Sequence, residues 1–325
     1  MAGTRPEFRV VEEAIELACH APSVHNSQPW RWVRERGELK LFLDTDRLVA
    51  TDLSGREALL SCGAVLDHLR VAMAAVGWAV HVDRFPNPDD HRHLATVGFS
   101  PSEVTEAQRA RADAIPRRRT DRLPFGPPPA WDRLEARLRG AIDGTVAHLD
   151  VVGDDDRPQL AEASQLSEAL RLYDSGYHAE LAWWTGETTA VDGIPDSSLV
   201  SAPESDRVDI GRVFPVTRHH PERRLTVPQD CSRVLVVSAR DDTDADVLGC
   251  GEMLSALLLE ATMAGMATCT LSHLTEVRTS REIIAALVGR DLPQVLVRVG
   301  VAPALEDPPA PTPRRAVTDV LELLL

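Results

Sequence analysis

Lysine is almost absent from this sequence, and basic residues of any kind are in the minority. Lys40 is the only lysine, so arginine supplies nearly all of the 35 basic residues, which face 50 acidic residues for a net charge of −15. A surface this acidic repels phosphodiester backbones and anionic lipids, so we expect neither nucleic acid nor a membrane as a partner. Any anion site must be built from guanidinium groups, backbone N–H groups or helix N-termini.

The sequence also lacks the marks of secreted, metal-binding and membrane proteins. Its 5 cysteines are scattered without a CxxC pair. No apolar run approaches the roughly 18 residues of a membrane span, and the first residues carry no signal-peptide stretch. Aromatic residues make up only 4%, yet hydrophobic residues reach 43%, enough for a sizeable core. We therefore expect a folded cytoplasmic protein with no metal site.

An internal repeat is the most informative feature that is present. Residues 62–79 (CGAVLDHLRVAMAAVGWA) and 250–267 (CGEMLSALLLEATMAGMA) align without a gap. Both are apolar nearly all round and lack proline, which predicts two buried helices. Each helix pattern ends at a glycine, Gly77 or Gly265, suited to the left-handed residue that closes a helix. Strand-like residues follow each copy, so we interpret the repeat as a duplicated helix–strand unit and expect two related halves.

Elsewhere, helical and strand patterns alternate along the chain. Helices are predicted at 10–21, 129–141 and 159–173, and strands at 39–44, 79–85, 94–99, 147–152, 233–240, 267–272 and 294–302. This mixture predicts an α+β fold. Between about 187 and 230 the periodicity fades and prolines gather. A stretch of this length is either a solvated insertion or a functional lid.

Three motifs could carry chemistry, although each has an ordinary structural explanation when taken alone. They are the turn APSVHNSQPW (21–30), the run RRRTDR (117–122) and the segment PTPRR (311–315). A polar turn can hydrogen-bond the edge of a flat heterocycle, and arginines bind phosphate through charged, often bidentate bonds. The alternatives are a packing loop, a basic turn neutralised by neighbouring acids, and a basic tail.

Taken together, the three motifs resemble the nitroreductase superfamily. RRTDRLPF is similar to its R-R-S-x-R-x-F signature, PSVHNSQPW to its P-S-S-x-N-x-Q-P-W segment, and PTPRR to its C-terminal basic pair. Their order in a single chain resembles the Acg-type FMN-binding oxidoreductases within that superfamily. The resemblance implies a nitroreductase-like α+β fold, duplicated in one chain as a pseudo-dimer, with central, mainly antiparallel sheets flanked by helices.

The resemblance also implies which residues bind FMN. The residues expected at the FMN phosphate are Arg118, Thr120 and Arg122, joined by Arg314 or, as the alternative, Arg315. The residues expected to line the isoalloxazine ring are Pro22, Ser23, Val24 and Asn26. Val24 replaces the family's second serine, so only its backbone could contribute. A backbone N–H facing flavin N5 is expected from Ser272 or His273, where the family's usual acidic–glycine pair is absent. No catalytic side chain is singled out.

The motifs are divided between the two expected halves. The first half (1–110) carries the ring turn, and the second half (111–325) carries the phosphate clamp and a candidate lid insertion at 187–230. Neither half repeats the other's motif, so only one composite site is complete. We therefore expect a monomer that imitates a homodimer and binds one FMN.

The resemblance implies an FMN-dependent oxidoreductase of the nitroreductase type. Hydride would pass by a ping-pong route from NAD(P)H to an electron-poor acceptor such as a nitroaromatic or a quinone. The alternative is an FMN-sequestering or storage protein, in which the candidate lid keeps donor and acceptor away from the flavin. The sequence alone distinguishes neither NADH from NADPH nor one acceptor from another.

Overall fold

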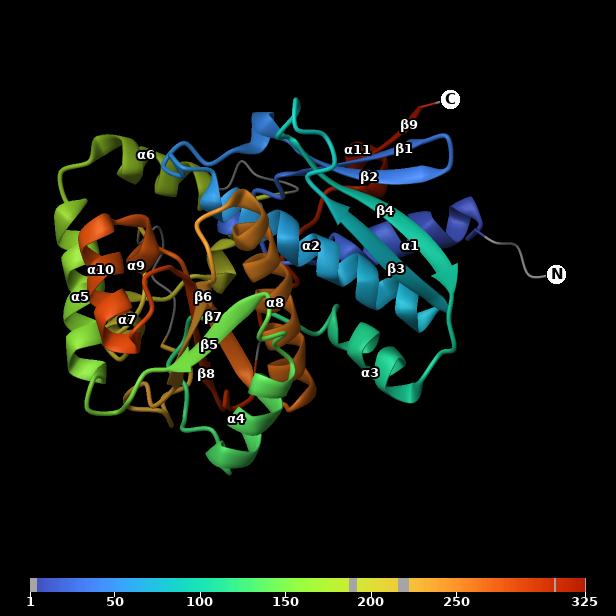
Figure 1. Cartoon of the computed structure of the whole chain (residues 1–325). Helices are drawn as coiled ribbons and strands as arrows, with labels where there is room; N and C mark the ends of the chain where they lie inside the picture. Colours follow the sequence, from blue (N-terminus) through green and yellow to red (C-terminus); the bar gives the residue numbers. More distant parts are fainter. Residues whose placement is uncertain (1–4, 187–191, 216–221, 307, 325) are drawn as a thin grey trace. The chain divides into compact units, whose positions relative to one another are not determined.

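The computed structural model describes residues 5–186, 192–215, 222–306 and 308–324, and the chain forms two compact units (Figure 1). Unit 1 comprises residues 1–118, 243–259 and 314–325, and unit 2 comprises residues 119–242 and 260–313. Neither unit is one continuous stretch, because the chain leaves unit 1 and returns to it twice. The domain halves expected at 1–110 and 111–325 stay a prediction.

Unit 1 contains a sheet of five strands in the order β3-β4-β2-β1-β9. The strands are β1 (Trp30–Glu35), β2 (Glu38–Leu43), β3 (Trp78–Arg84), β4 (His93–Pro101) and β9 (Leu321–Leu324). Neighbours are antiparallel except β1 and β9, which are parallel. The helices of this unit are α1 (Phe8–Ala18), α2 (Arg56–Ala75), α3 (Glu106–Ala114), α11 (Val317–Val320) and the larger part of α8 (Asp244–Met263).

Helix α2 forms the centre of unit 1 because its sequence is apolar on almost every side. It is long and apolar enough to cross a membrane, but 83% of its apolar window is buried within the protein. Such burial is what the core helix of a soluble protein shows. The chain turns away from α2 at Gly77, whose φ of 90° is the left-handed conformation expected from the sequence.

The two repeated helices meet through equivalent residues. A Cβ atom on Gly63 of α2 would lie 2.0 Å from the carbonyl oxygen of Leu248, and a Cβ atom on Gly251 of α8 would lie 2.2 Å from that of Leu60. Gly63 and Gly251 are separated by the offset of the repeat, and so are Leu60 and Leu248, so both contacts join equivalent positions of the two copies. The two copies therefore exchange the same contact, as surfaces related by a two-fold axis do. This reciprocity is what a duplicated fold predicts.

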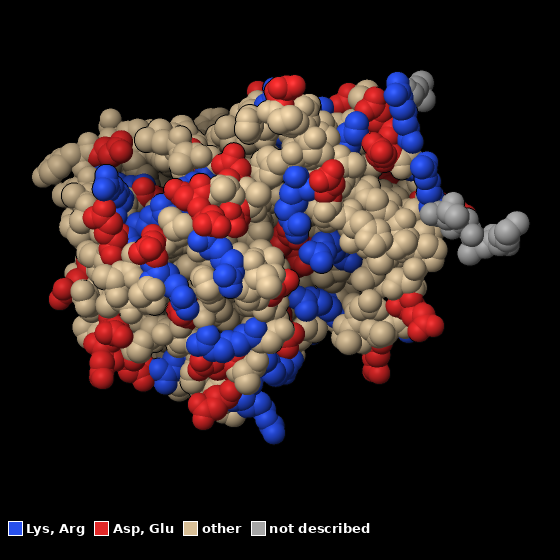
Figure 2. All heavy atoms as spheres, in the orientation of Figure 1, with Lys and Arg blue, Asp and Glu red and all other residues tan. Residues whose placement is uncertain are grey.

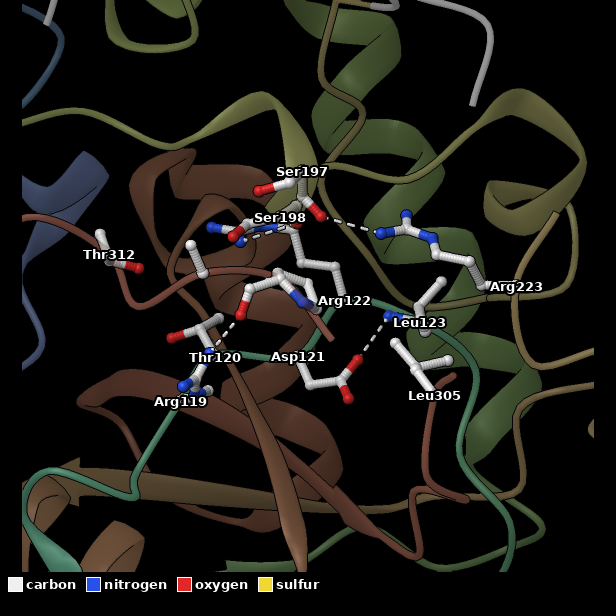
Figure 3. A pocket seen from close by; sticks show the side chains of 12 residues that line it. Arg119, Thr120, Asp121, Arg122, Leu123, Ser197, Ser198, Arg223, Leu305 and Thr312 are labelled. Carbon is white, nitrogen blue, oxygen red and sulfur yellow. Dashed lines mark hydrogen bonds between the residues drawn. The ribbon is translucent and has the colours of Figure 1, made fainter. Parts of the chain in front are cut away.

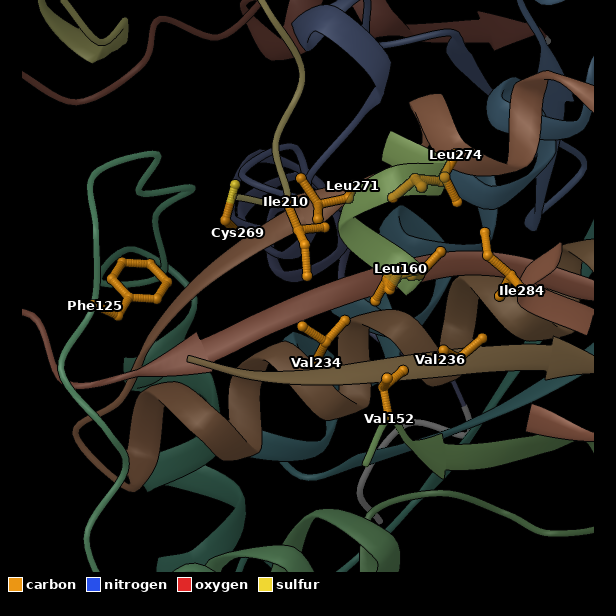
Figure 4. Close-up of a cluster of buried hydrophobic side chains, with 12 residues drawn as sticks. Phe125, Val152, Leu160, Ile210, Val234, Val236, Cys269, Leu271, Leu274 and Ile284 are labelled. Carbon is orange, nitrogen blue, oxygen red and sulfur yellow. The ribbon is translucent and has the colours of Figure 1, made fainter. Parts of the chain in front are cut away.

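Unit 2 contains a sheet of four antiparallel strands in the order β5-β6-β8-β7. The strands are β5 (Ala147–Val151), β6 (Arg233–Ala239), β7 (Ala267–Leu271) and β8 (Pro293–Gly300). The helices are α4 (Trp131–Gly140), α5 (Arg157–Leu170), α6 (Ser175–Trp184), α7 (Ala202–Ser205), α9 (His273–Glu276) and α10 (Arg278–Val288). Side chains of α5, α9 and α10 pack against those of the sheet in the core that Figure 4 shows, around Leu160, Val236 and Ile284.

The α+β prediction, with mainly antiparallel sheets, is confirmed, and each helix and strand expected from the sequence is present with shifted ends. In the candidate lid insertion at 187–230, residues 187–191 and 216–221 lie outside the described residues. Its described part forms only the short helices η3 (Asp196–Ser198) and α7. Acidic and basic side chains are interspersed over the face drawn in Figure 2.

Candidate functional site

The turn after α1 has a strained backbone. His25, Asn26 and Gln28 have φ values of 48°, 60° and 52°, a left-handed region that residues with a side chain rarely adopt. Three such residues among four consecutive positions cost several kcal/mol, at about 1–3 kcal/mol each, and they persist only because the surroundings hold them. Strain of this kind concentrates at ligand sites, which makes the turn a candidate for binding.

Hydrogen bonds to the neighbouring structure hold this turn in place. The Ser23 hydroxyl accepts from the backbone N–H of Gln28 at 3.1 Å. The backbone N–H of Val24 donates to the Ser61 hydroxyl of α2, also at 3.1 Å. The expected backbone contribution of Val24 to a ligand is therefore already engaged within the protein. Pro22 and Ser23 are half-buried, whereas Asn26 is buried.

Arg118 and Arg314 converge on the same carbonyl oxygen in unit 1. Arg118 donates from Nη2 to the carbonyl oxygen of His20 at 3.4 Å, and Arg314 donates from its own Nη2 to that oxygen at 3.3 Å. Arg314 also donates from Nη1 to Oδ1 of Asn26 at 3.0 Å. Unit 1 therefore brings together one arginine of the basic run, one arginine of the C-terminal pair and the asparagine of the strained turn.

Arg118 is a buried cation that has no counter-ion among the described residues. Arg118 is only 6% exposed, and its Nε and Nη1 atoms have no hydrogen-bond partner among the described residues. Burial, together with the charge of Arg314, lowers the pKa of Arg118 to about 9, so the group stays charged at neutral pH. A buried charge that no carboxylate pairs with is costly to maintain. An anion bound beside it would offset that cost.

Two histidine rings near these arginines carry no charge at neutral pH. Burial lowers the pKa of Arg314 to about 10. Burial also lowers the pKa of the His20 ring, with Arg314 adding to the effect, and lowers the pKa of the His68 ring, with Arg118 adding to it. Both rings are therefore neutral at neutral pH, and the region keeps the positive charge of its guanidinium groups.

Arg315 is committed to other partners. Its backbone N–H donates to the Gln28 side chain at 2.9 Å, and its guanidinium group pairs with Asp44 at 3.2 Å. The C-terminal pair is thus anchored rather than a loose basic tail. The charge of Arg315 is therefore balanced by a carboxylate within unit 1.

Thr120 and Arg122 lie in unit 2 and line a pocket there, which Figure 3 shows. Arg122 donates from Nη1 to the carbonyl oxygen of Ser198 at 3.3 Å, and its guanidinium group lies 5.0 Å from the ring centre of Phe214. Burial lowers the pKa of Arg122, and the nearby charge of Arg212 adds to this. Neither Arg118 nor Arg122 forms an ion pair within the described part of the chain, although the Asp121 carboxylate of the same run acts to raise the pKa of Arg122.

Ser272 and His273 lie directly after β7, as expected, within a different group of contacts in unit 2. The Ser272 hydroxyl donates to Glu276 at 2.9 Å and accepts from Arg212 at 3.2 Å. The His273 ring is 1% exposed and contacts the Ser164 hydroxyl through Nε2 at 2.9 Å. Burial, with the charge of Arg212 second, lowers the pKa of His273 to about 3, so the ring is neutral.

A buried ion cluster supports this segment and was not predicted. Arg212, from the candidate lid insertion, and Arg171 both pair with Glu276. Tyr177 of α6 accepts from Arg212 at 3.1 Å, and the Arg171 guanidinium lies 4.4 Å from the centre of the same ring. These partners are far apart in the sequence, so no local motif could have indicated the cluster.

The chain is closely similar to curated mycobacterial proteins, although no family model matches it. It is 59% identical over 326 residues to a Mycobacterium tuberculosis protein named "Putative NAD(P)H nitroreductase acg", covering 99% of this chain and 98% of that protein. A second M. tuberculosis protein, named as an NAD(P)H nitroreductase as well, is 37% identical over 322 residues, covering 98% of this chain and 92% of its own length.

Among solved structures, the FMN-dependent nitroreductase NfnB of Mycobacterium smegmatis, in complex with NADPH, matches 61% of this chain and 89% of its own chain. Its TM-score is 0.37 and its sequence identity 16%. The family assignment comes from the two curated relatives, which match this chain along nearly its whole length. The chain belongs to the Acg-type family of the nitroreductase superfamily.

Proposed function

We propose that the chain binds FMN and is an FMN-dependent NAD(P)H oxidoreductase. The observation that carries this proposal is Arg118, a buried guanidinium group with two unpartnered nitrogen atoms and no counter-ion among the described residues. A phosphate group bound there would accept charged hydrogen bonds from those atoms. Family membership supplies the identity of the phosphate ligand, since the relatives are named as nitroreductases.

The residues of unit 1 fit this cofactor. Arg118 and Arg314 would hold the FMN phosphate, and the strained turn around Asn26 would lie at the ring. Thr120 and Arg122, and the backbone N–H groups of Ser272 or His273, all belong to unit 2, and their part in FMN binding stays a prediction from the resemblance. When bound, the flavin supplies hydride transfer, and the protein supplies binding, orientation and electrostatics.

The hydride donor, the ping-pong mechanism and the acceptor are also proposals. The family name indicates a nicotinamide donor, and we propose ping-pong transfer to an electron-poor acceptor, a nitroaromatic or a quinone. The flavin-storage alternative is not favoured, because the relatives carry reductase names. A cytoplasmic location agrees with the buried, unpaired cysteines Cys19, Cys62, Cys250 and Cys269.

The experiment that tests this function is anaerobic mixing of the FMN-loaded protein with NADPH or NADH. A reductase loses the visible flavin absorbance within seconds and regains it when a nitroaromatic or a quinone is added. Flavin that remains oxidised with both donors would reject the reductase proposal and support storage. Protein that takes up no FMN at all would reject both.

The duplicated fold supports the further proposal of a monomer with one FMN per chain. The reciprocal contacts of Gly63 and Gly251 form within the chain the two-fold contact that two subunits of a dimer would form. Denaturing a known amount of loaded protein and measuring the released flavin gives the stoichiometry, and light scattering gives the mass in solution. Two flavins per chain, or a stable dimer, would contradict the proposal.

A further inference from the structure

The strained turn of residues 23–28 is held at both of its ends by side chains that lie outside it. Its left-handed residues, His25, Asn26 and Gln28, persist only because the surroundings hold them. The holding contacts come from helix α2 and from the last residues of the chain, and both of these segments belong to unit 1. The groups that make these contacts therefore decide which shape the turn presents to a ligand.

Ser61 of α2 holds the beginning of the turn. Its hydroxyl donates to the carbonyl oxygen of Glu57 at 2.6 Å and accepts from the backbone N–H of Val24 at 3.1 Å. Ser61 is only 4% exposed, so little water competes for either bond. The thiol of the neighbouring Cys62 donates to the carbonyl oxygen of Pro29, directly after the turn, at 3.2 Å. Helix α2 therefore fixes the chain on both sides of the strained residues.

Arg315 holds the end of the turn through Gln28. Its backbone N–H donates to Oε1 of Gln28 at 2.9 Å, and its Nη1 donates to the carbonyl oxygens of Gln28 and Trp30 at 3.2 and 3.4 Å. The buried Gln28 side chain extends this contact into the turn, because its Nε2 donates to the carbonyl oxygen of Asn26 at 3.3 Å. Asp44 pairs with the Arg315 guanidinium group. That group is thus engaged with the backbone of this region and with a carboxylate.

We propose that Ser61 and Arg315 are positioning residues, which keep the strained turn in the shape that receives the isoalloxazine ring and do not touch the flavin. This inference rests on the proposed function and deepens it. Without these contacts the turn would relax to ordinary backbone conformations, and the apparent dissociation constant would rise as the fraction of protein in the binding shape falls. A loosened turn acts on the ring, which FMN and riboflavin share, so both should weaken by the same factor.

Fluorescence titration of the apoprotein with FMN and with riboflavin tests this effect at the ring. Ser61→Ala removes one hydrogen bond, and Arg315→Lys keeps the charge opposite Asp44 but loses the forked donor group. We expect each variant to raise both dissociation constants by about 2- to 12-fold, the effect of one hydrogen bond, and to leave their ratio unchanged. The visible circular dichroism of bound FMN, which reports the surroundings of the ring, should change in both variants.

Ser255→Ala and Arg31→Lys are the matched controls in unit 1. Ser255 is buried in α8 and donates to Asp67 at 2.6 Å, and Arg31 forms an exposed ion pair with Glu322 at 2.6 Å. Both controls should leave the two constants and the dichroism unchanged, because a variant that has only lost stability still binds flavin equally well while it is folded. Equal effects in the controls and in the test variants would show a general loss of packing and overturn the proposal.

Amide hydrogen exchange of the apoprotein tests the holding of the turn without flavin. The backbone N–H groups of Val24 and Gln28 should exchange faster in Ser61→Ala and Arg315→Lys than in the wild type. Unchanged exchange in both variants would overturn the proposal. So would an Arg315→Lys variant that weakens FMN alone, because Arg315 would then act on the phosphate. A wild type that binds no flavin rejects the proposed function separately, and the exchange rates still decide whether the two residues hold the turn.

Discussion

Gly63 and Gly251 contact each other backbone to backbone where α2 and α8 cross. A Cβ atom on Gly63 would lie 2.8 Å from the Cα atom of Gly251, and a Cβ atom on Gly251 would lie 2.9 Å from the Cα atom of Gly63. Real Cβ atoms essentially never approach other atoms this closely, so only glycine allows the two helices this separation. The internal repeat in the sequence aligns these same two glycines with each other.

Replacing Gly63 by alanine should therefore destabilise the protein strongly. The new methyl group would lie 2.0 Å from the Leu248 carbonyl oxygen, a backbone atom that cannot rotate away. Overpacking in a core costs about 1–3 kcal/mol and occasionally more, and we expect the upper end or beyond. Urea unfolding measures this cost.

Gly140→Ala is the matched control for that measurement. Gly140 lies in helix α4, and a Cβ atom there would meet nothing within 4 Å. Because alanine is the better helix former, stability should stay the same or rise by up to about 1 kcal/mol. Similar losses for Gly63→Ala and Gly140→Ala would mean that α2 and α8 are not packed through their glycines.

The sequence predicted the repeated helices and strands of the fold because their signals are local. Segment 62–79 is apolar on every side, which marks a buried helix whatever surrounds it. Strand β9 was not predicted, since its four residues carry no alternating pattern and its partner is β1, nearly the whole chain away. Long-range pairing of this kind cannot be deduced from short segments.

The sequence motifs name the residues of the candidate site, which stay a prediction, but they do not show the surroundings of those residues. The motifs indicated Arg118 and Arg314, yet only the structure shows that both donate to one carbonyl oxygen and that Arg118 is buried with no counter-ion among the residues described. The run RRRTDR looked equally consistent with a turn neutralised by acids. Whether an arginine has a carboxylate neighbour depends on tertiary packing, and the same holds for the unpredicted Glu276 cluster.

Arg118→Ala should weaken FMN binding and leave riboflavin binding nearly unchanged. Loss of a charged hydrogen bond of roughly 1.5–3 kcal/mol corresponds to about 10- to 150-fold in the dissociation constant of FMN. Riboflavin has no phosphate, so it should bind the wild type poorly and be insensitive to the substitution. Flavin fluorescence titration of the apoprotein measures both constants.

The stability of the apoprotein separates this role from a structural one. Removing an uncompensated buried charge should leave the apo variant as stable as the wild type or more so, apart from lost packing of the side chain. Arg117→Ala, at an exposed position, is the control for both measurements. Equal weakening of FMN and riboflavin would refute the phosphate assignment.

Glu276→Gln should destabilise unit 2, because it would leave Arg171 and Arg212 without their shared carboxylate. The Glu276 side chain is 7% exposed, and removing one member of a buried ion pair costs about 3–5 kcal/mol. Urea unfolding is the measurement. Glu282→Gln, which breaks the exposed pair with Arg278, is the control and should scarcely change stability. Equal effects would show that the cluster is not buried in solution.

Acid should destabilise the protein partly through His273. Burial lowers the pKa of this ring to about 3, whereas an unfolded histidine takes up a proton near pH 6.5. As the pH falls from about 6.5 towards 3, the unfolded state therefore binds more protons than the folded state, and stability is lost. One such group contributes at most about 1.4 kcal/mol per pH unit. His68, whose pKa burial also lowers, adds a slope of the same sign.

Replacing His273 by glutamine should remove the part of this pH dependence that the His273 ring causes. Glutamine can keep a hydrogen bond to Ser164 but has no proton to gain, so the free energy of unfolding should fall less steeply between about pH 6 and 5, by up to about 1.4 kcal/mol per unit. His81→Gln is the matched control, since His81 is exposed and contacts Ser100 through Nε2 at 2.7 Å in the same way. Urea unfolding curves for the wild type and both variants give the slopes. If the curves of the wild type and His273→Gln run parallel, the buried ring takes up its proton in the folded state and is not held neutral as the structure indicates.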